Sequence, residues 1–165
     1  MLHKVSIDGM TMDPKSKTPI IVLKSEKDGR SIPIWIGLFE ATSIASTMKN
    51  VKFDRPMTHD LFKNLTSILN IEVSKVEVCD LRDNVFYAKI YFVSKENNFS
   101  IDARPSDAIA IALRFDAPIY VEEKILSKPK QGEVKAEAVD KSEEGKKWTE
   151  YLEKFSSEDF GKYKV

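Results

Sequence analysis

Residues 71–93 read IEVSKVEVCDLRDNVFYAKIYFV. Two runs rich in β-branched and aromatic residues, Ile71–Leu81 and Val85–Val93, flank the polar residues Arg82-Asp83-Asn84, which is typical of a β-hairpin. In the second run the alternate side chains that should share one face are all apolar: Phe86, Ala88, Ile90 and Phe92. The pattern predicts two antiparallel strands with one buried face.

Working outward from this hairpin, further strands are predicted at Leu2–Ile7, Pro19–Lys24, Ser31–Ile36, Phe99–Asp102 and Pro118–Val121. Helices are predicted from Leu38 to Lys49, from Thr58 onward, and from Pro105, because proline suits the first position of a helix. Strands and helices are interspersed without regular alternation. This order favours an α+β fold with a mixed or antiparallel sheet.

The helix that begins near Thr58 is predicted to be amphipathic. The Thr58 hydroxyl is expected to cap its first turn. An apolar stripe at helical spacing is expected to face the core, formed by Leu61, Leu65, Ile68 and Leu69.

A short internal repeat links two of the predicted strand-to-helix junctions. Glu40-Ala41-Thr42-Ser43-Ile44-Ala45 and Asp107-Ala108-Ile109-Ala110-Ile111-Ala112 share an acid, an alanine, two variable residues, an isoleucine and an alanine. Each follows a predicted strand. The two junctions are either structurally equivalent or similar only because acidic residues favour the start of any helix.

The chain is predicted to divide into a domain at 1–126, a tether at 127–141 and a C-terminal amphipathic helix and tail at 142–165. The tether contains no aromatic residue, whereas Trp148, Tyr151, Leu152 and Phe155 recur at helical spacing. This terminal helix is expected to pack either on its own domain or on a neighbouring subunit.

Composition limits the classes of protein that fit. The 165 residues include 42% hydrophobic residues, 26 basic and 26 acidic side chains and one cysteine, which suits one folded domain without an internal disulfide. A net charge of zero gives no overall attraction to nucleic acid, so any such site must be local. With neither a signal peptide nor a membrane-spanning run in the sequence, we expect a soluble cytoplasmic protein.

The first candidate site is Arg55-Pro56-Met57-Thr58-His59-Asp60, at a predicted helix start. Free amides there bind phosphate, with Arg55 and Thr58 as candidate substrate-binding residues. His59 suits general acid or base catalysis near neutral pH, and Asp60 is a candidate catalytic carboxylate. The alternative is that these residues only cap the helix and complement its dipole.

The second candidate site is Asp102-Ala103-Arg104-Pro105-Ser106-Asp107. Asp102 and Asp107 could hold Mg²⁺ or Mn²⁺, and Asp107 could also act in catalysis, while Arg104 and Ser106 could bind a phosphate. The alternative is an internal ion pair that orders the turn. Glu40 is a third candidate, either as a catalytic carboxylate or as a dipole-complementing residue.

Several motifs together resemble the bifunctional nuclease family: Ile32-Pro33-Ile34-Trp35-Ile36-Gly37, Glu40-Ala41, Arg55-Pro56-Met57-Thr58-His59-Asp60-Leu61, Phe86-Tyr87-Ala88, Ile101-Asp102-Ala103-Arg104-Pro105-Ser106-Asp107-Ala108-Ile109-Ala110 and Ala117-Pro118-Ile119-Tyr120-Val121. The resemblance extends from Leu2 to Leu126. It implies an α+β fold and a homo-oligomer, and plant relatives are credited with degrading DNA and RNA.

Three hypotheses for function remain open from the sequence. The first is a nuclease that hydrolyses phosphodiester bonds of DNA or RNA, helped by Mg²⁺ or Mn²⁺. The second is a non-enzymatic oligomeric module that binds an anion or a protein in regulation, which the zero net charge favours. In the third, the charged clusters are salt bridges between subunits, with no ligand.

Overall fold

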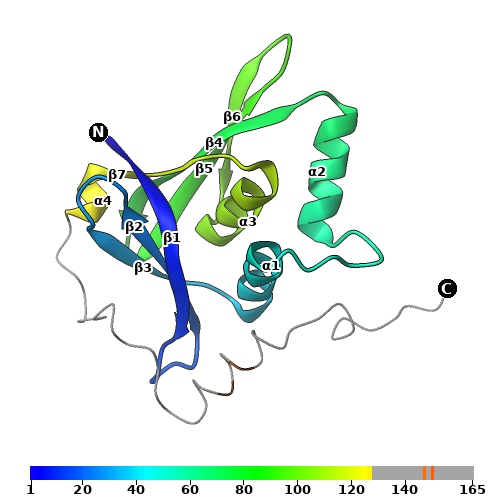
Figure 1. Ribbon diagram of the computed structural model, residues 1–165. Helices are drawn as coiled ribbons and strands as arrows, with labels where there is room; N and C mark the ends of the chain where they lie inside the picture. The colour runs from blue at the N-terminus through cyan, green and yellow to red at the C-terminus, as the bar shows by residue number, and fades with distance from the viewer. Residues whose placement is uncertain (128–146, 148–149, 151–165) are drawn as a thin grey trace.

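A seven-stranded sheet with helices packed against it forms the body of the protein, and the computed structural model describes residues 1–127, 147 and 150 (Figure 1). The strands are β1 (Leu2–Met12), β2 (Pro19–Ser25), β3 (Ser31–Trp35), β4 (Glu72–Arg82), β5 (Val85–Val93), β6 (Asn98–Ala103) and β7 (Ile119–Glu122). The helices are α1 (Leu38–Met48), α2 (Thr58–Ile68), α3 (Pro105–Phe115) and the short α4 (Glu123–Leu126). The predicted α+β class is confirmed.

The order of the strands shows two similar halves. Across the sheet the order is β3-β2-β1-β7-β4-β5-β6, so β3 and β6 are the two edges. Each half is a run of three antiparallel strands, β1-β2-β3 or β4-β5-β6, followed by a helix of 11 residues, α1 or α3. The predicted strand-to-helix repeat therefore corresponds to a repeat of topology. β7 lies between the halves, antiparallel to β1 and parallel to β4.

The core lies between the sheet and the helices α1 and α3, which contact each other. The β4–β5 hairpin turns at Asp83 and Asn84, which both have positive φ (48° and 63°), as the favoured two-residue turn requires. The predicted buried face of β5 is confirmed at Ala88, Ile90 and Phe92. Ile44 of α1 and Ile109 of α3 are fully buried.

Helix α2 does not bury its apolar stripe, and the prediction that it does is wrong. All four residues of the stripe are exposed: Leu61 59%, Leu65 54%, Ile68 76% and Leu69 56%. Helix α2 contacts α3 through a different side, where Thr66 is buried and Phe62 packs against the core. Figure 1 shows α2 at the outside of the molecule, beyond α3. Its helical periodicity is real, but the stripe faces solvent.

The start of α2 also differs from the prediction. Thr58 is the first helical residue, and the capping position belongs to Met57. The carboxylate of Asp60 accepts a hydrogen bond from the Met57 N–H at 3.0 Å, which satisfies one of the amides left free at the helix start. The acidic residue therefore does the capping expected of the threonine hydroxyl.

The C-terminal part of the chain is outside the description. The predicted tether and terminal helix fall almost wholly beyond the described residues, so both stay predictions. Among the residues that are described, no helix has the length and apolarity to cross a membrane.

Candidate active site

The beginnings of α1, α2 and α3 meet around one pocket of about 340 Å³. Phe39 and Glu40 of α1, Thr58 and His59 of α2, and Asp107 of α3 are among its lining residues. Each helix start carries partial positive charge from its aligned peptide dipoles and unpaired N–H groups. Three such starts around one hollow favour an anionic ligand.

His59 is held through both ring nitrogens. Its Nε2 lies 3.3 Å from Oδ1 of Asp107 in α3, and its Nδ1 lies 2.9 Å from Oγ of Ser43 in α1. An ionised carboxylate only accepts hydrogen bonds, so Asp107 selects the tautomer with the proton on Nε2. Nδ1 then accepts a hydrogen bond from the Ser43 hydroxyl and is the basic nitrogen of the site.

Arg104 connects the two repeated junctions. Its Nε and Nη2 donate to Asp107 at 2.7 and 3.1 Å, and its Nη1 donates to Oε1 of Glu40 at 2.9 Å. The hydrogen bonds with Asp107, and then the charge of Glu40, raise the pKa of Arg104 above its ordinary value. The side chain is 67% exposed, and three of its five N–H groups are used by these carboxylates. Two N–H groups of Arg104 are therefore not used by these two carboxylates.

Gly37 makes room for this connection. The carboxylate of Glu40 folds back over Gly37, where the Cβ of any other residue would collide with Oε2 of Glu40. Because the N-cap residue Gly37 has no side chain, Glu40 can reach Arg104 across the pocket.

Asp60 is not among the residues that line the pocket, but it bonds Arg114 of α3, which does line it. Its Oδ1 accepts a hydrogen bond from Arg114 Nε at 2.6 Å, and Arg114 is 8% exposed. Arg114 also donates to the carbonyl oxygens of Ala110 and Ser43, at 3.0 and 3.5 Å. Asp60 and Arg114 therefore tie α1, α2 and α3 together, which fixes where the helix starts lie.

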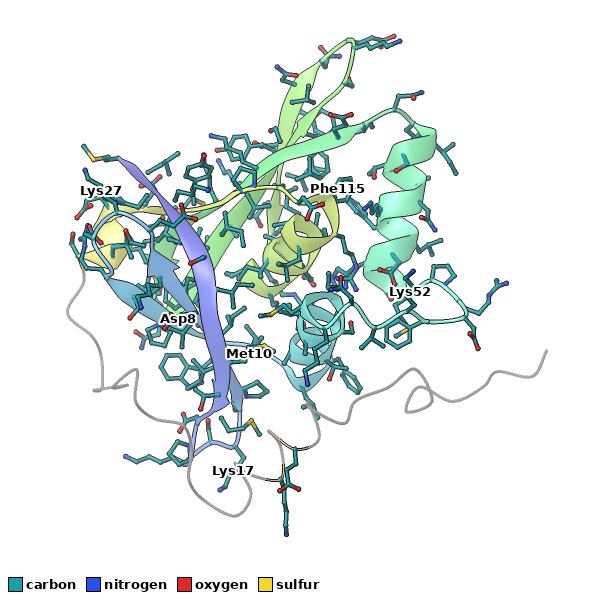
Figure 2. All side chains as sticks on the ribbon, viewed as in Figure 1. Asp8, Met10, Lys17, Lys27, Lys52 and Phe115 are labelled. Carbon is teal, nitrogen blue, oxygen red and sulfur yellow. The ribbon has the colours of Figure 1, made fainter. Side chains whose placement is uncertain are left out.

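A second contact between α2 and α3 lies near the far end of α3. The Lys63 ammonium donates to the carbonyl oxygen of Arg114 and lies 5.6 Å from the centre of the Phe115 ring. Phe115, the last residue of α3, is labelled in Figure 2. The charged groups of α2 at positions 60 and 63 are thus both directed at α3.

Not every candidate from the sequence lies in the pocket. Thr58 lines it, whereas Arg55, on the exposed loop before α2, and Ser106, which is 6% exposed, do not. Asp102 pairs with Lys89 in register, between Ile101 and Ala103, so its side chain lies on the face of the sheet opposite to α3. The predicted roles of Arg55, Ser106 and Asp102 stay predictions.

The side chains do not form an evident metal site. Asp102 and Asp107 do not share a side of the sheet, and both oxygens of Asp107 already bond Arg104. Within residues 1–127, 147 and 150, no group of three His, Cys, Asp or Glu side chains is placed to hold a metal ion. The arrangement fits anion binding by Arg104 better than cation binding by Asp107.

Two residues of the site were not singled out from the sequence. Ser43 was visible only as one of several hydroxyl residues on the polar side of α1. Arg114 was visible as the one polar residue in the otherwise apolar run 108–115. A lone arginine in a buried helix was the available signal, because a buried guanidinium requires an acceptor.

Comparison with known proteins identifies the family of this chain. The family described as the bifunctional nuclease domain matches residues 21–133. This chain belongs to the bifunctional nuclease domain family. The resemblance inferred from the motifs is thereby confirmed.

Relatives of two kinds match the chain. An uncharacterized protein of Mycobacterium tuberculosis H37Rv is 35% identical over 164 residues, which cover 96% of this chain and 98% of that protein. Bifunctional nuclease 1 of Arabidopsis thaliana is 37% identical over 109 residues, and that of Oryza sativa subsp. japonica is 32% identical over 110. The match covers 33% of the length of each plant protein.

Proposed function

We propose that this protein is a nuclease that hydrolyses phosphodiester bonds of DNA or RNA. The main support is that His59, Asp107 and Arg104, from two helices far apart in sequence, are hydrogen bonded to one another beside a single pocket. In this proposal His59 is the general base, the Asp107 carboxylate orients it, and the Arg104 guanidinium binds the phosphate. The plant relatives named as nucleases agree with this chemistry.

Arg104 binds the scissile phosphate in this proposal. Its two remaining N–H groups lie in the plane of the guanidinium and donate to the phosphate oxygens. The free amides at the start of α2 add to the attraction for the phosphate. Thr58 donates its hydroxyl to a phosphate oxygen, and Arg55 binds a neighbouring phosphate of the same strand. Glu40 and Asp107 hold the Arg104 guanidinium in place between them.

His59 moves the proton. A water oxygen attacks phosphorus, its proton passes to Ser43 Oγ, and the Ser43 proton passes to Nδ1 of His59. The bond between phosphorus and the leaving oxygen breaks, and that oxygen takes a proton from solvent. Asp107 stabilises the imidazolium that results, because its carboxylate bonds Nε2. The His59 imidazolium then releases its proton to solvent, which restores the neutral base.

The predicted Mg²⁺ or Mn²⁺ is tested separately, since none of these steps passes through a metal. The measurement is the rate of cleavage before and after dialysis against EDTA. A loss of activity restored by Mg²⁺ or Mn²⁺ supports the prediction, and an unchanged rate makes it wrong.

The experiment that tests the nuclease uses a fluorescently labelled oligonucleotide and His59→Ala purified by the same procedure as the parent. The substitution should lower the cleavage rate about 10²–10⁴-fold, as expected for loss of a general base. Equal rates, with contaminating nucleases removed, would refute the role of His59. A parent that cleaves no faster than a mock purification without the protein would contradict the nuclease proposal. Binding without cleavage would favour the regulatory anion-binding module instead.

We also propose that the predicted homo-oligomer forms through the exposed stripe of α2. The stripe carries no charge, and both Asp60 and Lys63 are directed at α3, so two copies of α2 could pack together without burying an unpaired charge. Such a face is complementary to itself, as a twofold contact requires.

Sedimentation of Leu65→Glu tests the α2 contact. The parent should sediment as a dimer or larger and the variant as a monomer. Val85→Glu, at a position 55% exposed on the β4–β5 hairpin, serves as the control and should keep the mass of the parent. A monomeric parent, or an unchanged mass for Leu65→Glu, would rule out this contact.

A further inference from the structure

Phe39 is an exposed aromatic side chain at the mouth of the pocket. It is 87% exposed, the most exposed large hydrophobic side chain among the described residues. Helix α1 packs into the core through other positions, including Ala41 and Ile44, so the fold does not need a phenyl ring at position 39. An aromatic ring left in water beside a pocket that also contains charged side chains is a surface on which a flat ligand can stack.

The ring lies beside the charged part of the site. Phe39 immediately precedes Glu40, whose Oε1 accepts a hydrogen bond from Arg104 at 2.9 Å, and all three residues line the pocket. A phosphate on the free N–H groups of Arg104 therefore brings whatever is attached to it close to Phe39. In a nucleic acid, the attached group is a sugar that carries a flat base.

We propose that the pocket takes single-stranded nucleic acid and that Phe39 stacks on an unpaired base next to the bound phosphate. This inference rests on the proposed nuclease function and names its substrate class. Bases of a single strand have free faces that stack on aromatic side chains, whereas the faces of bases in a duplex are already covered.

The experiment compares variants that distinguish the aromatic ring of Phe39 from an apolar side chain without a ring. Phe39→Leu and Phe39→Ala should each raise KM for a single-stranded oligonucleotide about 5–100-fold, while kcat changes little. Phe39→Trp should recover most of the affinity, because it keeps an aromatic face. Leu38→Ala is the matched control, since Leu38 is 50% exposed at the neighbouring position but does not line the pocket, and it should behave as the parent.

The substrate is varied in the same assay. Cleavage of a duplex of the same sequence should be slow and insensitive to Phe39→Ala. A single strand with an abasic site at the bound position should bind the parent as weakly as Phe39→Ala binds the intact strand. The loss of affinity from removing the base and the loss from removing the Phe39 ring should therefore not be additive.

Specific results would overturn the proposal. Phe39→Leu with the KM of the parent would show that no stacking occurs, and a penalty for Phe39→Ala that persists on the abasic strand would show the same. A lower sedimenting mass of Phe39→Ala would assign the ring to a subunit contact. Binding of the same oligonucleotides, measured by fluorescence anisotropy, tests stacking without turnover. A failure of the nuclease proposal is seen separately, as a parent that cleaves no faster than a mock purification.

Discussion

The two halves of the sheet repeat one topology but contribute differently to the pocket. In the first half the junction between β3 and α1 supplies Glu40, which bonds only Arg104 within the site. In the second half the junction between β6 and α3 supplies both Arg104 and Asp107, and Asp107 also bonds His59. In the proposed mechanism, the same acidic position after a strand supports Arg104 in one half and orients His59 in the other.

The halves differ in burial as well. Eight residues of α3 are buried, compared with five of α1. Helix α3, which carries Asp107, is therefore fixed more firmly in the core than α1, and this suits hydrogen bonds that depend on the position of that carboxylate.

The largest expected difference between the halves is in activity. Asp107→Asn should lower kcat about 10²–10⁴-fold, because His59 loses the acceptor that selects its tautomer. Glu40→Gln should lower it less than about tenfold, since Arg104 keeps its two bonds to Asp107. Steady-state kinetics on a single-stranded oligonucleotide measure both, and equal losses would remove the distinction between the junctions.

The next difference is in stability. Ile109→Ala and Ile44→Ala each create a cavity at a fully buried position and should lower the free energy of unfolding by about 2–5 kcal/mol. The loss should be larger for Ile109, because the more deeply buried α3 has less freedom to relax. Urea denaturation measures both, with the exposed Leu38→Ala expected to change stability by less than about 0.5 kcal/mol. A larger loss at Ile44 would contradict the ranking.

A smaller effect is expected at Gly37, in the first junction. Gly37→Ala displaces the Glu40 carboxylate and replaces a favourable N-cap residue, so it should cost about 1 kcal/mol. Gly9→Ala is the control, because nothing lies within 4 Å of the added methyl group. Thermal unfolding compares the two variants. Equal stability would show that the Glu40 side chain adopts another conformation at no cost.

The smallest effects are pH dependences of opposite sign. The Trp35 indole donates to Asp13 at 2.9 Å and lowers the pKa of that carboxyl to about 2, so this bond stabilises the protein above pH 3.8 and is lost as the pH falls through about 2. In the second half the Tyr91 hydroxyl donates to Glu77 at 2.7 Å, which raises the pKa of Tyr91 to about 12. That contribution is present below pH 10.0 and is lost as the pH rises through about 12.

Two titrations check these directions. Trp35→Phe should raise the pKa of Asp13 toward 3.8. The NMR signal of the Asp13 carboxyl carbon measures this pKa. Glu77→Gln should lower the pKa of Tyr91 toward 10.0. The absorbance of tyrosinate measures this pKa, and subtracting the titration of Tyr91→Phe removes the signal of the other tyrosines. Unchanged midpoints would show that the hydrogen bonds do not set these pKa values.

Local patterns predicted the elements of the fold better than their contacts. The alternation in β5 identified its buried face, because a strand next to a core has only two faces to choose between. The stripe of Leu61 and Leu65 was equally regular, but the spacing of apolar residues does not say whether a protein's own core or another surface covers them. The sequence therefore predicted the helix correctly and its buried side wrongly.

The candidate site shows the same limit. The helix starts were recognisable from His59, Arg104 and Asp107, but the bond between His59 and Asp107 joins residues 48 positions apart and depends on how α2 crosses α3. The part played by Ser43 depends on that crossing too, since a serine on the polar side of a helix has no distinguishing pattern of its own. Long-range packing decides which of several polar residues meet.

The place of β7 gives the fold an order of assembly. This strand is formed by residues 119–122, after both meanders in the chain, yet it lies in the middle of the sheet and joins β1 to β4. During synthesis on the ribosome, both three-stranded units emerge before the strand that links them. A chain cut short before Ile119 would leave the facing edges of β1 and β4 unpaired and open to aggregation.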